Sequence, residues 1–276
     1  MKPALPQPRG LLSSLPPLFP MLSLGIATLG LNGQASAIAV DSELVLLVDV
    51  TQSGLNKKDF GSLMDSYASS FTSSEVLRSI QSGTFGRIAV SMMFYGNSSV
   101  QEVGIPWMSI GNATEAAQFA ALASNISKPF SNGSADIASA LTAATLSFGK
   151  ETGGLSNGFE SNVQIIDVAA ASTPGGSGQA ARDAALQSGV DLINAIALGN
   201  KATAIASYFS TDVIGSTLSG VAATSTTSPV NTLLTAALTT EITGSVSMGA
   251  SAVPEPHTAL ALMTGLGFML ILRRRS

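Results

Sequence analysis

Residues 43–53 of this 276-residue chain are Glu-Leu-Val-Leu-Leu-Val-Asp-Val-Thr-Gln-Ser, and this stretch predicts the architecture around it. The run from Glu43 to Asp49 is leucine and valine between two acidic residues, a composition typical of strands buried on both faces of a parallel sheet. Such a strand needs helices on both sides of its sheet. The hydroxyl-bearing residues that follow predict a polar loop at the strand's carboxyl end.

The segments that follow alternate between helix and strand patterns. Phe60, Leu63, Met64, Tyr67 and Phe71 recur at spacings of three and four, which places them on one face of a helix. A short turn at 96–99 predicts one antiparallel edge strand after it. We expect further strands at 87–95, 100–107, 163–168 and 191–198, and further helices at 112–122, 136–148, 178–187 and 229–243. This order predicts a doubly wound α/β fold with a mainly parallel central sheet and helices on both faces.

The loop after the first strand has the composition of a metal site. Asp49, Thr51 and Ser53 alternate along it, so their oxygens point the same way if the backbone is extended. Oxygen ligands suit hard cations, and the pattern therefore predicts a site for Mg²⁺ or Ca²⁺. An aspartate at a strand end followed by hydroxyl residues is also ordinary turn chemistry, and that alternative stays open.

The same spacing resembles the Asp-x-Ser-x-Ser motif of the metal-ion-dependent adhesion site (MIDAS) in von Willebrand factor A domains, with Thr51 in place of the first serine. The surrounding segments occur in the order found in a family of secreted bacterial von Willebrand A-like proteins, namely at 49–60, 86–90, 105–107, 128–131, 163–168 and 189–194. The resemblance covers nearly all of residues 38–252. It implies the von Willebrand A fold and a noncatalytic module that binds a partner through loops at the carboxyl edge of the sheet.

The resemblance also implies ligands from two further loops, and the chain departs from the family in both. Where the family has a threonine in the second loop, counting from either side gives Ser134 or Ala135. Ala171 replaces the family's second aspartate in the third loop, so the expected site is degenerate, because divalent affinity depends on ligand charge and number. The ligands expected by resemblance are Asp49, Thr51, Ser53 and Ser134.

Residues 1–37 have the layout of a secretory signal peptide. A cationic start with Lys2 and Arg9 is followed by an apolar run at 11–31 and by Ala-Ser-Ala at 35–37. Prolines inside the run argue against a membrane-spanning helix. We therefore predict that residues 1–37 are removed and that the domain at 38–252 is exported.

Residues 253–276 combine three elements, and their order resembles the PEP-CTERM sorting signal that exosortase enzymes recognise in Gram-negative bacteria. An apolar segment at 259–272 separates the Pro-Glu-Pro motif from the terminal arginines; these two groups are Pro254, Glu255, Pro256 and Arg273, Arg274, Arg275. The resemblance implies processing by an exosortase and delivery to the cell surface or extracellular matrix. The segment is shorter than the roughly 20 residues of a full span, which favours a transient inner-membrane anchor over a permanent one.

Composition excludes several classes of function. The chain has no cysteine, and its single histidine, His257, lies in the tail, which excludes thiolate metal sites and a Ser-His-Asp triad in the body. Of 13 basic and 17 acidic residues, five basic and one acidic lie in the two terminal segments, leaving the body a net charge of −8. This charge argues against nucleic acid as a partner.

Three functions remain open. The first, which we favour, is a noncatalytic adhesion module that binds an unknown surface protein or exopolysaccharide at its loops. The second is a structural matrix protein that uses the same fold without metal. The third is a carbohydrate-active hydrolase with paired carboxylates drawn from Asp49, Asp136 and Asp167.

Overall fold

The computed structural model describes residues 36–129, 132–218, 225–228 and 243. The sorting tail, nearly all of the predicted signal peptide and all but the last residue of the helix expected at 229–243 lie outside these ranges. Within them, none of the helices is both long enough and apolar enough to cross a bilayer.

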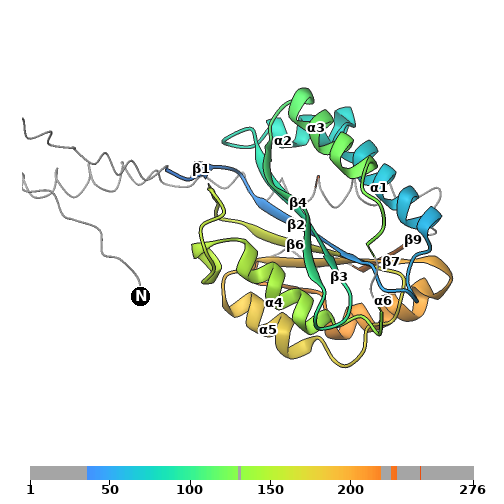
Figure 1. Cartoon of the computed structure of the whole chain (residues 1–276). Coiled ribbons are helices and arrows are strands. Elements are labelled where there is room, and N and C mark those ends of the chain that lie inside the picture. Colours follow the sequence, from blue (N-terminus) through green and yellow to red (C-terminus); the bar gives the residue numbers. More distant parts are fainter. Residues whose placement is uncertain (1–35, 130–131, 219–224, 229–242, 244–276) are drawn as a thin grey trace, which may run out of the picture. The chain divides into compact units, whose positions relative to one another are not determined.

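A mainly parallel sheet forms the centre of the domain (Figure 1). Its strand order is β4-β3-β2-β6-β7-β8, and β9 also pairs with β7. The strands are β2 (Glu43–Asp49), β3 (Ile88–Tyr95), β4 (Gln101–Ile110), β6 (Gln164–Ala170), β7 (Leu192–Leu198), β8 (Gly215–Ser216) and β9 (Ser225–Ser228). The antiparallel pairing of β4 with β3 confirms the predicted edge strand, and β8 adds a short antiparallel strand that was not predicted.

Helices cover both faces of this sheet, which confirms the doubly wound α/β fold (Figure 1). The first core packs beneath α1 (Lys57–Phe71), α2 (Ser74–Gln81) and α3 (Ala113–Ser124). The second packs beneath α4 (Ile137–Ser147), α5 (Gln179–Gln187) and α6 (Ala202–Asp212). Four smaller elements complete the described fold: strands β1 (Ile38–Ala39) and β5 (Phe159–Glu160), which pair with each other, and 3₁₀ helices η1 (Lys150–Thr152) and η2 (Gly199–Lys201).

Strand β2 explains why the leucine and valine run is continuous. It lies between β3 and β6 and is parallel to both. Leu44, Leu46 and Val48 enter the core on one face, whereas Val45 and Leu47 enter the core on the other. Because side chains alternate along a strand, a strand buried on both faces carries apolar residues at every position.

Two strands extend further than the sequence pattern predicts. Strand β4 continues past Trp107 to Ile110, and β6 continues past Val168 to Ala170. Alanine has low strand propensity, but Ala170 is buried and pairs with β7, so packing outweighs propensity. The third loop therefore begins at Ala171, two residues later than expected.

At the opposite, amino edge of the sheet, two buried carboxylates accept hydrogen bonds from neighbouring loops. Glu43 accepts hydrogen bonds from Asn157 Nδ2 at 2.5 Å and from Ser161 Oγ at 3.0 Å. Asp41 accepts bonds from the backbone amides of Phe85 and Arg87. Burial raises the pKa of Glu43, and the bonds from Asn157 and Ser161 oppose that rise only in part.

The raised pKa of Glu43 makes part of the stability depend on pH. The folded state holds the proton more tightly than the unfolded state, so this contribution is complete below the ordinary pKa of 4.5 and is lost as pH rises through the folded value. Glu43→Gln removes the titration, and Ser161 Oγ can then accept from the new amide. We expect the variant to gain stability relative to the natural chain as pH rises from 4 to 7, measured by urea unfolding. A constant difference across that range would contradict the assignment.

Candidate functional site

Asp49 is the centre of a buried polar cluster at the carboxyl edge of the sheet. Its Oδ1 accepts hydrogen bonds from the Thr51 amide at 2.8 Å and the Thr51 hydroxyl at 2.7 Å. Its Oδ2 accepts a bond from Ser172 Oγ at 2.5 Å, and the hydroxyl oxygens of Thr51 and Ser172 lie 3.0 Å apart. Asp49 is 1% exposed, Thr51 0% and Ser172 6%. Both oxygens of the carboxylate therefore have donors from the protein itself.

The loop that carries Thr51 folds tightly over this carboxylate. The Gly54 amide donates to the Thr51 carbonyl at 3.1 Å and so closes a turn. A Cβ at position 54 would lie 3.1 Å from Asp49 Oδ2 and 3.2 Å from Thr51 Oγ1. A larger residue here would have to displace these oxygens by a few tenths of an ångström. The turn leaves little free space beside Oδ2.

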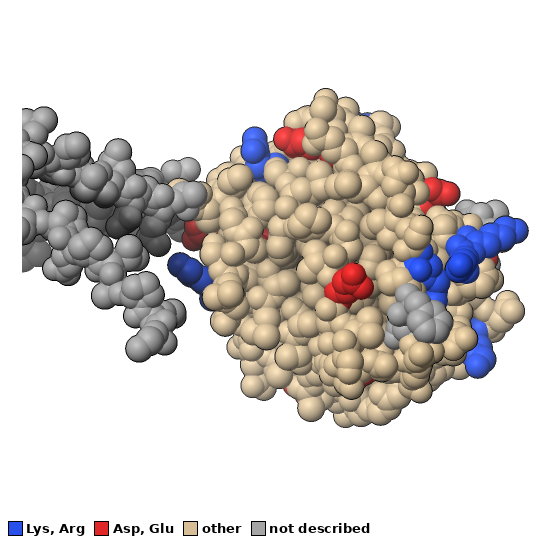
Figure 2. Space-filling view, in the orientation of Figure 1, with Lys and Arg blue, Asp and Glu red and all other residues tan. Residues whose placement is uncertain are grey.

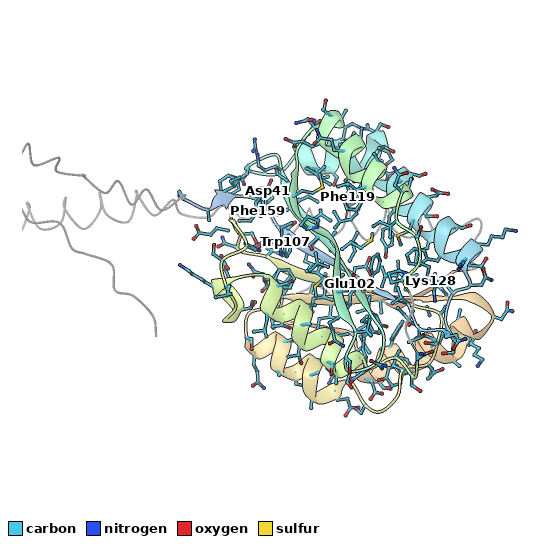
Figure 3. The ribbon with its side chains drawn as sticks, viewed as in Figure 1. Asp41, Glu102, Trp107, Phe119, Lys128 and Phe159 are labelled. Atoms are coloured by element: carbon cyan, nitrogen blue, oxygen red, sulfur yellow. The ribbon has the colours of Figure 1, made fainter. Side chains whose placement is uncertain are left out.

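Lys128, in the segment after α3, supplies a positive charge to the same loop. Its Nζ donates to the backbone carbonyls of Val50 and Thr51, each at 2.9 Å. Burial lowers the pKa of Lys128, and the negative charge of Asp49 opposes that change. Figure 3 shows Lys128 near the first turn of α1. We call Asp49, Thr51, Ser172 and Lys128 the edge cluster.

The structure brings together two of the four residues expected as metal ligands. Asp49 and Thr51 are hydrogen-bonded, whereas Ser53 and Ser134 are exposed and have no hydrogen bond to the edge cluster. The neighbouring Ala135, which was the alternative to Ser134, is buried at 1% exposure. The sequence pattern thus identifies the first loop and the contact between Asp49 and Thr51. It does not identify the residue of another loop that contacts Asp49.

Sequence reasoning missed two members of the edge cluster, Lys128 and Ser172. Because β6 extends to Ala170, the third loop begins at Ala171, the position where the family has its aspartate. Ala171 packs against the apolar core, and Ser172 reaches Asp49. The sequence does show a hydroxyl residue, Ser172, directly after Ala171. Its contact with Asp49 can be predicted only when the end of β6 is known.

The residues at this edge do not fit the predicted Mg²⁺ or Ca²⁺ site. Such ions take several oxygen ligands, commonly including more than one carboxylate. Here Asp49 is the one carboxylate of the edge cluster, and its oxygens already accept three hydrogen bonds. Among the described residues, no group of three or more His, Cys, Asp or Glu side chains could hold a metal ion. Hydrogen bonds within the protein satisfy this carboxylate without a metal.

The carboxylates considered for glycoside hydrolysis do not converge. Asp49 lies on the face of the sheet that carries Leu47, whereas Asp167 lies on the opposite face, in line with Ile165. Asp136 caps α4 by accepting from the amide and hydroxyl of Ser139. A pair flanking one scissile bond requires both carboxyl groups in one cleft. These three do not form such a pair.

A groove elsewhere on the domain, of about 660 Å³, is mostly apolar, and its polar lining residues, Ser91, Ser147, Ser156 and Asn157, include no titratable side chain. It lies between β4 and α4 and is lined by Val103, Trp107, Leu146 and Leu155, of which Leu155 is 90% exposed. The Trp107 indole N–H donates to the Ser147 carbonyl at 2.8 Å, so it has no remaining hydrogen for a ligand. This groove is an apolar surface without convergent catalytic side chains.

The chain belongs to a family of proteins of unknown function, DUF1194, whose model matches residues 39–246. Among curated proteins, no sequence matches this chain.

Solved structures similar to the chain include matrix and adhesion proteins. Proximal thread matrix protein 1 from the mussel byssus is 14% identical, with a TM-score of 0.48 over 78% of this chain and 49% of that one. A second structure of the mussel protein has a zinc-occupied MIDAS motif, at 13% identity and a TM-score of 0.46 over 76% of this chain and 46% of that one. The chain spans about half the length of the mussel protein.

Two further similar structures are bacterial. The von Willebrand factor type A protein from Catenulispora acidiphila is 11% identical, with a TM-score of 0.40 over 78% and 43% of the two chains. The pilus adhesin SpaC from Lactobacillus rhamnosus GG is 11% identical, with a TM-score of 0.43 over 78% and 31%. At these identities and scores, the function has to be argued from this chain's own residues.

Removing the Ser172 hydroxyl should destabilise the domain. Ser172→Ala leaves Asp49 Oδ2 buried without its donor, which costs about 1–3 kcal/mol in the free energy of unfolding. Ser134→Ala, at an exposed serine of the neighbouring loop, should change it by less than about 0.5 kcal/mol. Urea denaturation of both variants tests this. Equal effects would mean that Ser172 does not stabilise the carboxylate.

Divalent cations should leave the melting temperature unchanged. A ligand that binds only the folded state raises the transition midpoint, by an amount that grows with its concentration relative to the dissociation constant. Because Asp49 is already satisfied, we expect the same midpoint in EDTA, Mg²⁺ and Ca²⁺. A rise with either ion that is absent in Asp49→Ala would restore the metal site.

Proposed function

We propose that the chain is a noncatalytic binding module, exported to the cell surface or extracellular matrix, that holds its partner through the loops at the carboxyl edge of its sheet. The observation that carries this proposal is that exposed polar side chains at that edge lie on loops above a buried, hydrogen-bonded carboxylate. Gln52 and Ser53 are exposed on the loop that the edge cluster anchors, and Ser134 is exposed on the neighbouring loop, which backbone bonds to Gly96 and Gly175 hold in place. We call these three residues the loop face.

This arrangement suits binding better than catalysis. The Ser172 hydroxyl donates to a carboxylate that also accepts from Thr51, so no free base stands ready to activate it. Lys128 is held by two backbone carbonyls rather than beside a nucleophile. A recognition surface needs only loops in a fixed arrangement, and the cluster provides that.

The patterns at the two ends of the sequence support export. A signal peptide at 1–37 would direct the chain out of the cytoplasm, and the apolar segment at 259–272 would anchor it transiently in the inner membrane. Processing by an exosortase near Pro254, Glu255 and Pro256 would then release it to the surface or matrix. The partner in this proposal is a surface protein or an exopolysaccharide.

Matrix retention tests the proposal. Replacing Ser53 and Ser134 together by Glu places larger, charged side chains on the loop face without touching the buried edge cluster. We expect this variant to lose most of its association with isolated host matrix. Thr84→Glu, at an exposed position before β3 on the opposite edge, should be retained like the natural chain. Equal retention of all three would instead favour the structural matrix protein that uses no loop contact.

A further inference from the structure

We infer that Lys128 takes the place of the adhesion-site metal, and that its ammonium group receives a carboxylate of the partner, which makes the partner an acidic polysaccharide. This inference rests on the proposed function and names the ligand class of the same loop face. It starts from the failure of the edge cluster to fit a divalent ion.

The ammonium group of Lys128 has a fixed position and an unused donor. An ammonium carries three N–H groups, and two of them are held by the carbonyls of Val50 and Thr51. Across the described ranges, the third N–H has no acceptor. The side chain is only partly buried, so solvent or a ligand can reach it. A cation anchored on the Asp49 loop with one open position is the electrostatic counterpart of a metal that keeps one open ligand site.

Lys128 is the accessible charge of the edge cluster. Asp49 is buried and surrounded by donors, and the Asp59 carboxylate accepts from Asn56 at the start of α1. The carboxyl edge also carries charges of both signs. The lysines are Lys57 and Lys58 in the first turn of α1 and Lys201 immediately before α6, and the carboxylates are Glu102, which pairs with Phe94, and Asp136, whose amide donates to Gly96. Figure 2 shows basic side chains gathered at one end of the domain, with acidic side chains beside them and a broad surface with few charges next to them. The edge as a whole has charges of both signs, and the accessible charge of the edge cluster itself is the ammonium group of Lys128.

The composition of the loop face favours a polysaccharide over a protein. Protein interfaces have a core of aromatic and aliphatic side chains. The exposed large apolar residues of the described chain lie elsewhere, at Ile38, Val103, Leu122, Leu146 and Leu155. Amide and hydroxyl groups of Gln52, Ser53 and Ser134 match the hydroxyl groups of sugars. A sugar acid would therefore place its carboxylate on Lys128 and its hydroxyls on the loop face.

Binding of the purified full chain to polygalacturonate in EDTA tests this inference, with the methyl-esterified polymer as the uncharged control. We expect binding to the acid form only. Lys128→Gln should weaken it about tenfold, because a hydrogen bond between charged groups is lost. Lys57→Gln, at an exposed lysine of the same edge, should weaken it less than about threefold, as a surface charge does. Lys128→Arg, which keeps the charge, should retain most of the affinity.

Thermal melting of each variant checks that the loop remains folded. If Lys128→Gln has a lowered melting temperature, two other measurements still test the inference. These are the salt dependence of polygalacturonate binding by the natural chain and the affinity of the Lys128→Arg variant. Equal binding of acid and ester, or unchanged affinity in a folded Lys128→Gln variant, would overturn the inference. Equally tight, Lys128-dependent binding of polyglutamate would overturn the assignment to polysaccharide. Loss of matrix retention in the Ser53 and Ser134 variant would leave the proposed function standing in either case.

Discussion

The buried carboxylate of Asp49 is the constraint on which the rest of the carboxyl edge depends. Strand β2 is covered on both faces, so its last side chain ends inside the domain, where an unpaired charge is very costly. Each neighbouring feature reduces that cost. Thr51 and Ser172 donate to the two oxygens, and Gly54 lets the backbone turn closely around them. The loop conformation follows from satisfying this one group.

The same constraint links the architecture to the proposed function. A metal ion is one way to neutralise a carboxylate at a strand end, and donors from the protein together with a nearby lysine are another. In this chain the second solution fixes the loops from within, and it leaves the exposed hydroxyl and amide groups free for a partner. Because Asp49 is buried, the accessible charge of the edge cluster is the ammonium group of Lys128. Recognition by such an edge depends on ionic strength rather than on divalent ions.

Much of the fold was predictable because its signals are local. The helical spacing from Phe60 to Phe71 is confirmed by burial of all five predicted residues, and the helix expected at 112–122 is confirmed as α3, with Asn112 as its N-cap. Helix α2 was not predicted although its signals are local, with Ser73 as N-cap and Val76 and Ile80 on one buried face, whereas tertiary packing decides where β6 ends. For the same reason Asp49 and Thr51 could be paired from sequence, but Ser172 could not. Its contact spans 123 residues and depends on where β6 ends.

The most direct measurement is hydrogen exchange at the backbone amide of Thr51, which donates to Asp49 Oδ1. If the edge cluster is complete without metal, this amide is strongly protected in EDTA, and Mg²⁺ or Ca²⁺ adds nothing to its protection. Fast exchange in EDTA that becomes slow only when a divalent ion is added would contradict the account, because the loop would then need a metal to form.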